Sequence, residues 1–377
     1  MHRRESLLLV TGVVIVILGV LFYTLKKNFT PNVPPRQVVK FPRGIYALIE
    51  WGKFPHEETW QESFVDGVVI RIYWRDLNPR EGEYDWKELD GQFRKARQYN
   101  KKIRLMVAPG FYSPDWIFTK RIQTAHFTVP QGPSKGSIKP LPLPWDSTYL
   151  SFWYQFVDAL ASRYRDNPSF TYISVTGPNS HNGEVSLPRE VEDEKTWMKL
   201  TSSNQTTLLE KLAEAWEKTI NHFCLSWKGK HFTIALINKS LPVGGDDVLE
   251  DDYKARLVTY GATQCPQTFG VQTNGLDGRP LYPKDRDPLP HWQLIDMYAG
   301  RIFTAFQTRA PGNLYPQSFQ ASSTLKQDIL RQALIVNGIG RNVDVLEVYE
   351  HDIADLVLQP VIEEAHRRLM LEYTHSL

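Results

Sequence analysis

Residues 171–188, TYISVTGPNSHNGEVSLP, contain the side chains of this sequence that are best suited to chemistry. A short β-rich run ends at a Gly-Pro pair, and a polar segment then leads to the carboxylate of Glu184. In barrels of parallel strands, the loops that follow the strands build the active site. We therefore expect Glu184 at the mouth of such a barrel, with Asn179 and His181 beside it as neutral hydrogen-bonding groups.

A second carboxylate lies inside an apolar run near the C-terminus, VLEVYEHD at 345–352. A carboxylate in a strand that is covered on both faces is costly unless it is paired or functional. Glu347 and Tyr349 are two residues apart in this run, so in a strand both side chains should point the same way, into the mouth of the barrel. Glu347 is therefore a candidate nucleophile or base. The alternative is a structural Glu347 paired with Arg71, a cation inside the predicted strand 68–74.

Other side chains at the ends of predicted strands could contact a sugar. Trp74, Tyr112 and Trp116 are suited to stacking on a pyranose face, and packing within the loops is the alternative for all three. Glu50 ends the first predicted strand, where it would either pair with Arg71 or accept a hydrogen bond from a substrate hydroxyl. The remaining neutral candidates for substrate binding are Gln272, Asn274 and Gln307.

Short β-type runs alternate with amphipathic helical stretches, a pattern typical of βα units around a parallel sheet. The predicted strands are 45–50, 68–74, 103–108, 172–176, 232–237, 269–272, 302–307 and 345–348. Long insertions at 109–146 and 190–206 both follow strands. Because crossover connections are right-handed, a closed barrel is favoured over an open sheet. The expected fold class is α/β, a (β/α)8 TIM barrel over residues 44–377 that follows one N-terminal transmembrane helix.

The composition excludes some classes of partner. The 377 residues include 44 Lys and Arg and 42 Asp and Glu, so the charges nearly cancel and no nucleic-acid partner is implied. The 11 Trp and 17 Tyr would suit carbohydrate faces, and an aromatic-rich core explains them equally well. No Gly-rich phosphate loop, metal-ligand spacing or Ser-His-Asp pattern occurs, so we expect neither a cofactor nor a metal.

Residues 7–25, LLLVTGVVIVILGVLFYTL, are almost wholly apolar and have basic residues on both sides. A helix of about 19 residues can span a hydrocarbon core of about 30 Å. No cleavage site follows, so we predict an uncleaved signal anchor at 1–27 and a Pro-containing tether at 28–43. The flanking charges discriminate orientation poorly. We expect a single-pass membrane protein with an extracytoplasmic barrel.

The two cysteines, Cys224 and Cys265, are too few for a disulfide scaffold or a zinc site. Both precede predicted strands and would lie at the N-terminal face of the barrel. Either they form a bridge, which would favour an extracytoplasmic domain, or they are two buried thiols.

Residues 65–90, VDGVVIRIYWRDLNPREGEYDWKELD, resemble the strand-2 region of retaining glycoside hydrolases, notably the family-42 and family-35 β-galactosidases. In those enzymes R-x-x-W is followed by P-x-x-G-x-Y-D-W. Residues 107–117, VAPGFYSPDWI, resemble the turn that follows strand 3 there. The likeness covers the first half of the barrel.

The resemblance implies hydrolysis of a glycosidic bond by two carboxyl groups. Family members carry the acid/base glutamate directly after strand 4, in an Asn-Glu pair, and the nucleophile at the end of strand 7. Glu184 is the candidate acid/base, although it lies eight residues after Thr176. Gln307 stands where the nucleophile is expected, so Glu347 is the candidate substitute. The alternative is a catalytically inactive carbohydrate-binding protein that lost its nucleophile at Gln307.

Overall fold

The computed structural model describes residues 41–132, 134–244, 246–279, 290–315 and 322–374. The predicted signal anchor and most of the tether lie outside the described residues. Among the helices that are described, none is both long enough and apolar enough to cross a membrane.

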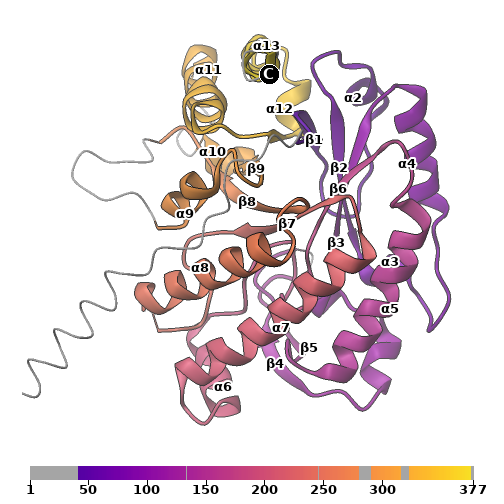
Figure 1. Cartoon of the computed structure of the whole chain (residues 1–377), viewed down its shortest axis with the longest axis vertical. Helices are drawn as coiled ribbons and strands as arrows, with labels where there is room; N and C mark the ends of the chain where they lie inside the picture. Colours follow the sequence, from indigo (N-terminus) through magenta and orange to yellow (C-terminus); the bar gives the residue numbers. More distant parts are fainter. Residues whose placement is uncertain (1–40, 133, 245, 280–289, 316–321, 375–377) are drawn as a thin grey trace, which may run out of the picture. The chain divides into compact units, whose positions relative to one another are not determined.

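Eight parallel strands form a closed barrel, which confirms the predicted (β/α)8 fold (Figure 1). In spatial order they are β1 (Gly44–Leu48), β10 (Val345–Tyr349), β9 (Phe303–Thr308), β8 (Phe269–Leu276), β7 (His231–Leu236), β6 (Phe170–Ser174), β3 (Lys102–Ala108) and β2 (Gly67–Tyr73). Strand β8 is longer than predicted, and its extension places Asn274 in the barrel wall.

Helices surround the barrel (Figure 1). They are α2 (Glu57–Gln61), α3 (Trp74–Leu77), α4 (Lys87–Gln98), α5 (Ser147–Tyr164), α6 (Val191–Leu200), α7 (Gln205–Ser226), α8 (Asp247–Gln264), α9 (Pro290–Tyr298), α10 (Pro311–Leu314), α11 (Ser323–Arg331), α12 (Glu350–Ala354) and α13 (Gln359–Thr374). The chain between α11 and β10 continues as the π-helix η3 (Gln332–Gly338) and the 3-10 helix η4 (Ile339–Arg341). Side-chain caps start α5 and α7, where Asp146 accepts from Tyr149 N and Asn204 from Thr207 N.

The insertion after β3 is ordered rather than open loop. It contains the 3-10 helices η1 (Gly110–Tyr112) and η2 (Asp115–Thr119) and a hairpin of β4 (Thr124–Thr128) and β5 (Ile138–Pro142). The second predicted insertion contains α6. Helix η1 begins directly after the exit of β3, so it lies at the end of the barrel where the predicted site loops meet.

The interior of the barrel is apolar at its N-terminal end. Phe303 and Val345, at the starts of their strands, pack with Tyr46 and Tyr172, and Phe41 packs against this cluster from outside the strands. Further along the same strands the interior becomes polar and charged. The barrel is therefore closed at one end by side chains, and its polar groups gather toward the other.

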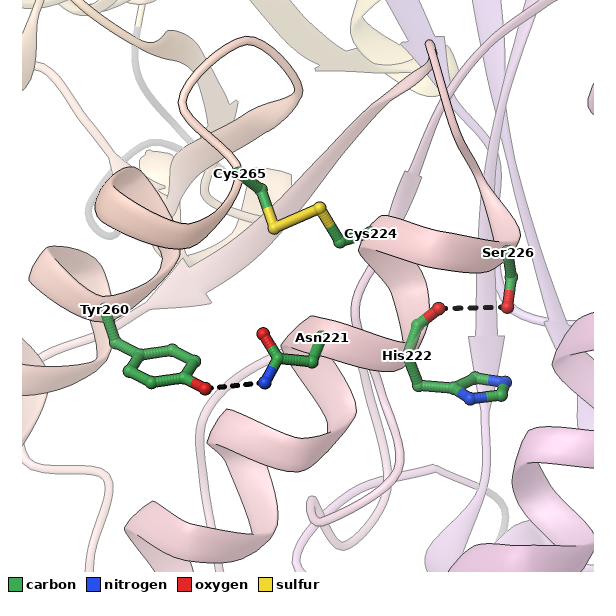
Figure 2. The surroundings of a disulfide bond; sticks show 6 residues. All are labelled: Asn221, His222, Cys224, Ser226, Tyr260 and Cys265. Carbon is green, nitrogen blue, oxygen red and sulfur yellow. Dashed lines mark hydrogen bonds between the residues drawn. A yellow bond between two sulfur atoms is a disulfide. The ribbon is translucent and has the colours of Figure 1, made fainter.

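A disulfide joins Cys224, near the end of α7, to Cys265, just after α8 (Figure 2). Their Cα atoms lie 6.2 Å apart. Beside the bridge, Asn221 Nδ2 donates to Tyr260 Oη (2.6 Å), which forms a second link between the same two helices. Of the two alternatives drawn from the sequence, the bridged form is therefore correct.

Candidate functional site

Glu184 reaches the exit of the fourth barrel strand by a detour of the chain. Ser174, the last residue of β6, pairs with Thr233, whereas Glu184 forms a parallel bridge with Ala235, two residues further along β7. Val185 N donates to Ala235 O (2.9 Å). The intervening residues form a loop that leaves the sheet and returns to it. The predicted fold-back is confirmed. The loop brings Glu184 back to the sheet just beyond the exit of β6, beside Ala235 of β7.

The loop that returns Glu184 rests on η1. Phe111 N donates to Ser180 O (2.8 Å). Gly110 has φ +65°, and a Cβ built on it would lie 2.1 Å from Ser180 O. Within the loop, Asn179 Oδ1 accepts from Gly177 N (2.8 Å). Only glycine at position 110 permits this approach of the two backbones, so the segment after β3 fixes the position of the loop after β6.

Two amides hold the carboxyl group of Glu184. Asn182 Nδ2 donates to Oε2 (2.8 Å) and Asn274 Nδ2 to Oε1 (3.1 Å). The side chain is partly exposed. Burial raises the pKa of Glu184 above its usual value, while the two amides and the charge of Arg71 act in the opposite direction. A carboxyl group that has a raised pKa and remains accessible is suited to general acid catalysis.

Glu347 lies inside the barrel and is fully buried. Its Oε1 lies 3.2 Å from Arg104 Nε and accepts from Tyr172 Oη (2.7 Å), and its Oε2 accepts from Gln272 Nε2 (3.0 Å). The counter-charge is therefore Arg104 and not Arg71. Arg104 is not among the candidates drawn from the sequence. It could have been found by the same rule as Glu347, because it too is a charged residue inside a buried strand.

The enclosure of Glu347 bears on its predicted role. Solvent does not reach the side chain, and both of its oxygens are engaged. Attack on a sugar would require the side chains that enclose Glu347 to move and give the sugar access. The role of nucleophile or base stays a prediction for this residue, whereas the structure gives it a packing and charge-balancing role directly.

The two predicted carboxylates are joined through side-chain amides. Glu184 accepts from Asn274, Asn274 Oδ1 accepts from Gln272 Nε2 (2.9 Å), and the same Gln272 nitrogen donates to Glu347. Gln272 Oε1 in turn accepts from Arg104 Nη2 (3.0 Å). Gln272 is fully buried, so its predicted contact with substrate is replaced by this internal link, whereas Asn274 is partly exposed.

Arg71 lies at the exit of β2 with only 6% of its surface exposed. Its Nε donates to Ile49 O (2.5 Å), and its guanidinium carbon lies 5.3 Å from the ring centre of Trp51 and 5.5 Å from that of Tyr349. Burial lowers the pKa of Arg71, and the neighbouring Tyr349 opposes this shift. Neither predicted pairing is formed, because Glu50 points to solvent and Glu347 pairs elsewhere.

The aromatic side chains predicted to stack on sugar pack instead within the loops. Trp74 is fully buried in a cluster with Trp116, and Tyr112 is 4% exposed with its hydroxyl donating to Gln131 O (3.0 Å). Trp116 is partly exposed, and its Nε1 donates to Asn78 O (3.0 Å). The stacking role is wrong for Trp74 and Tyr112 because both are buried: Trp74 packs against Trp116 and against Trp153 of α5, and Tyr112 packs against Tyr73.

Three further candidates surround the mouth. Gln307 is inward-facing and 7% exposed, in register with Glu347 on the neighbouring strand. His181 is 6% exposed, its Nδ1 lies 2.6 Å from Ser180 Oγ, and burial lowers its pKa to about 4. Within the described part of the chain, His181 Nε2 and Asn179 Nδ2 have no hydrogen-bond partner. These two atoms are thus left for a ligand or water.

A cavity of about 920 Å³ opens beside the exits of β1 and β10. Glu50 and Tyr349, both predicted to bind substrate, line it together with Lys53 and His351. The volume is sufficient for a small oligosaccharide by the usual dimensions of ligand pockets, about 300–1,000 Å³. In the described ranges, no cluster of three His, Cys, Asp or Glu side chains could hold a metal ion.

Comparison with known proteins agrees with this architecture. Residues 60–227 match the model of glycoside hydrolase family 42, described as β-galactosidase. Over 180 residues, 45% of this chain, the sequence is 24% identical to β-galactosidase LacA of Lactobacillus acidophilus and equally to LacZ of strain NCFM of that species. The match spans about a quarter (26%) of each relative.

Among solved structures, β-galactosidase from the psychrophilic Marinomonas ef1 superimposes with a TM-score of 0.54 at 11% identity, over 89% of this chain and 60% of that one. The catalytic domain of β-amylase from Paenibacillus polymyxa superimposes with a TM-score of 0.51 at 8% identity, over 86% of this chain and 98% of that one. At these identities the likeness concerns the fold alone. The family-42 resemblance seen in the sequence is thus confirmed: this chain is a (β/α)8 barrel that is similar over residues 60–227 to the family-42 β-galactosidases.

Proposed function

We propose that this barrel hydrolyses a glycosidic bond with Glu184 as the general acid. The observation that carries the proposal is the return of Glu184 to the strand exit beside Ala235, partly exposed and with a pKa raised by burial. A protonated carboxyl group at the mouth can donate its proton to the leaving glycosidic oxygen.

A hydrolase also needs a carboxylate that reaches the anomeric carbon or a water molecule beside it. Glu347 is enclosed, whereas Glu50 is exposed two residues after the end of β1 and lines the 920 Å³ cavity. We assign activation of water to Glu50, and to Glu347 the positioning of Gln272 and, through Asn274, of the acid. Because Glu50 would act on water and not on the sugar, this assignment predicts inversion at the anomeric centre.

The test is turnover of a panel of aryl β-glycosides by the full chain in detergent. Glu184→Gln and Glu50→Gln should each lower kcat by about 100-fold or more, the usual contribution of a general acid or base. Glu83→Gln, which removes a carboxylate from an exposed turn, is the matched control. Unchanged turnover in Glu184→Gln would overturn the assignment of the acid, and unchanged turnover in Glu50→Gln would return the second role to Glu347.

Binding of carbohydrate without cleavage is the second candidate function. It is favoured by Gln307, an amide where the resemblance places the nucleophile, and by the enclosure of Glu347. An amide cannot form a glycosyl-enzyme ester. Saturable binding of oligosaccharides by a wild-type protein that turns over none of the aryl glycosides would select this function.

We further infer that residues 7–25 anchor the chain in a membrane and that the barrel lies on the extracytoplasmic side. The disulfide between Cys224 and Cys265 supports this orientation, because such bonds persist mainly in oxidising compartments. Deletion of residues 1–27 should release the protein from alkali-washed membranes. Protease should reach the barrel in intact cells, and complete protection from protease would place it on the other side.

A further inference from the structure

The mouth of the barrel contains a buried cation, Arg71, that forms no ion pair within the described part of the chain. Only 6% of the surface of Arg71 is exposed, and among the described residues no carboxylate forms an ion pair with it. Arginine is rarely buried unless it is paired, because removing its charge from water is costly. Its Nε donates to Ile49 O and its guanidinium also hydrogen-bonds Tyr349, and neither partner is a carboxylate.

The carboxylates that share the interior with Arg71 are already engaged. Glu347 is neutralised by Arg104 at 3.2 Å and also bound by Tyr172. Glu184 is held by the side-chain amides of Asn182 and Asn274 and forms no ion pair with Arg71. Among the described residues Arg71 therefore has no ion-pair partner, and an anionic ligand would supply one.

Aromatic rings surround this cation and extend from it along the exits of the first three strands. Trp51 stacks on Tyr73 with ring centres 5.5 Å apart and an interplanar angle of 12°, and Tyr73 contacts Tyr112 at 4.2 Å. Arg75 lies over the same row, 5.2 Å from the ring of Tyr73. Of these rings, Trp51 is partly exposed. A guanidinium over an aromatic face keeps its in-plane N–H groups for bidentate contact with a carboxylate.

We propose that this part of the mouth binds a sugar that carries a carboxylate, a residue of the uronic acid class. Arg71 binds the carboxylate through its terminal nitrogens, and the exposed part of Trp51 contacts the sugar ring. The inference rests on the proposed function for the sugar itself. Beyond that function, we infer that the sugar is negatively charged and that the buried guanidinium of Arg71 recognises its carboxylate.

The experiment compares non-hydrolysable ligands that differ only in charge. Phenyl 1-thio-β-D-glucuronide and 1-thio-β-D-galacturonide are titrated against the full chain at pH 7 and low salt, beside the corresponding thioglucoside and thiogalactoside, with tryptophan fluorescence as the readout. At least one acid should bind about tenfold or more tightly than its neutral counterpart, a factor that corresponds to about 1.4 kcal/mol.

Variants of Arg71 identify the group responsible. Arg71→Gln should abolish the preference for the acid, and Arg71→Lys, which keeps the charge without the planar fork, should reduce it. Arg97→Gln removes the same charge from an exposed position on α4 and should leave the preference unchanged. If Arg71→Gln does not fold, Arg71→Lys decides the question, and an undiminished preference in that variant would count against the proposal.

Equal affinity for acid and neutral ligands, absence of binding by all four, or a preference that survives Arg71→Gln would each overturn the inference. Its failure can be told apart from that of the proposed hydrolase. Turnover of neutral glycosides with no preference for acids rejects only the anionic subsite. Binding of uronides that depends on Arg71, in a protein that cleaves nothing, rejects only the hydrolase.

Discussion

Arg104 Nε lies 3.2 Å from Glu347 Oε1, and solvent reaches neither side chain. The two residues come from β3 and β10, which are not neighbours in the barrel, so the ion pair crosses its interior. Tyr172 from β6 and Gln272 from β8 complete the set of contacts. Side chains of four strands are therefore tied together directly beneath the mouth, and Glu184 is connected to them through Asn274.

The first prediction concerns the stability of this arrangement. Glu347→Gln leaves the Arg104 guanidinium buried without a counter-charge, so the free energy of unfolding should fall by about 3–5 kcal/mol. Urea unfolding followed by tryptophan fluorescence measures the change. Glu192→Gln breaks an exposed pair with Lys195 and should cost less than about 1 kcal/mol. A loss for Glu347→Gln as small as that of the control would refute the structural role.

The second prediction is the pH dependence of turnover. Because Glu184 acts in its protonated form, activity should fall as pH rises through its pKa, which burial places above the usual value for glutamate. The amide of Asn274 favours the charged form, so Asn274→Ala should raise the pKa and move this alkaline limb to higher pH. The profile of kcat against pH records the shift. A limb that moves to lower pH would contradict the assignment.

The third prediction is the corresponding effect on stability. The folded state binds the proton of Glu184 more tightly than the unfolded state does, so this group makes the protein less stable as pH rises from the ordinary glutamate range through the raised pKa. Glu184→Gln removes the titration. As pH rises through that interval, the wild type should lose stability that the variant keeps. The unfolding free energy of the variant minus that of the wild type should therefore increase with pH. A difference independent of pH would show that the pKa is not raised.

The fourth prediction tests how η1 positions the loop that carries Glu184. Gly110→Ala places a Cβ against Ser180 O, so the loop must shift and turnover should fall together with stability. Gly82→Ala is the matched control, because Gly82 also has a positive φ (+72°) but no atom lies within 4 Å of the added carbon. Both variants incur left-handed strain of about 1–2 kcal/mol. Only Gly110→Ala should reduce kcat, and equal effects would exclude the loop contact as the cause.

The fifth prediction concerns the bridge between α7 and α8. Cys224 and Cys265 are separated by 41 residues in sequence, and for a loop of that length the chain-entropy model gives a stabilisation of about 4 kcal/mol. Cys224→Ser should lower the free energy of unfolding by about that amount in urea. Treatment of the wild type with reductant should have the same effect. If reductant leaves the unfolding curve unchanged, the bond does not contribute to stability.

The alternation of strands and helices was determined by the sequence itself. Apolar runs such as 68–74 and 345–348 have the length and residue types of buried strands, and each signal is local. The extension of β8 that carries Asn274 was missed, because Asn and Gly are depleted in strands and tertiary pairing overrides that preference here. The local pattern also placed Glu184 after the fourth strand and Glu347 inside the eighth.

The tertiary structure decided which groups meet. That Glu347 pairs with Arg104 and not with Arg71 depends on the order and stagger of strands around a closed barrel, to which distant segments contribute together. Whether Trp74 faces a ligand or its neighbours depended likewise on the insertion after β3 and on α5, which both pack against it. A sequence specifies local periodicity directly, whereas contacts across a barrel follow from the simultaneous pairing of all its strands, which no single segment encodes.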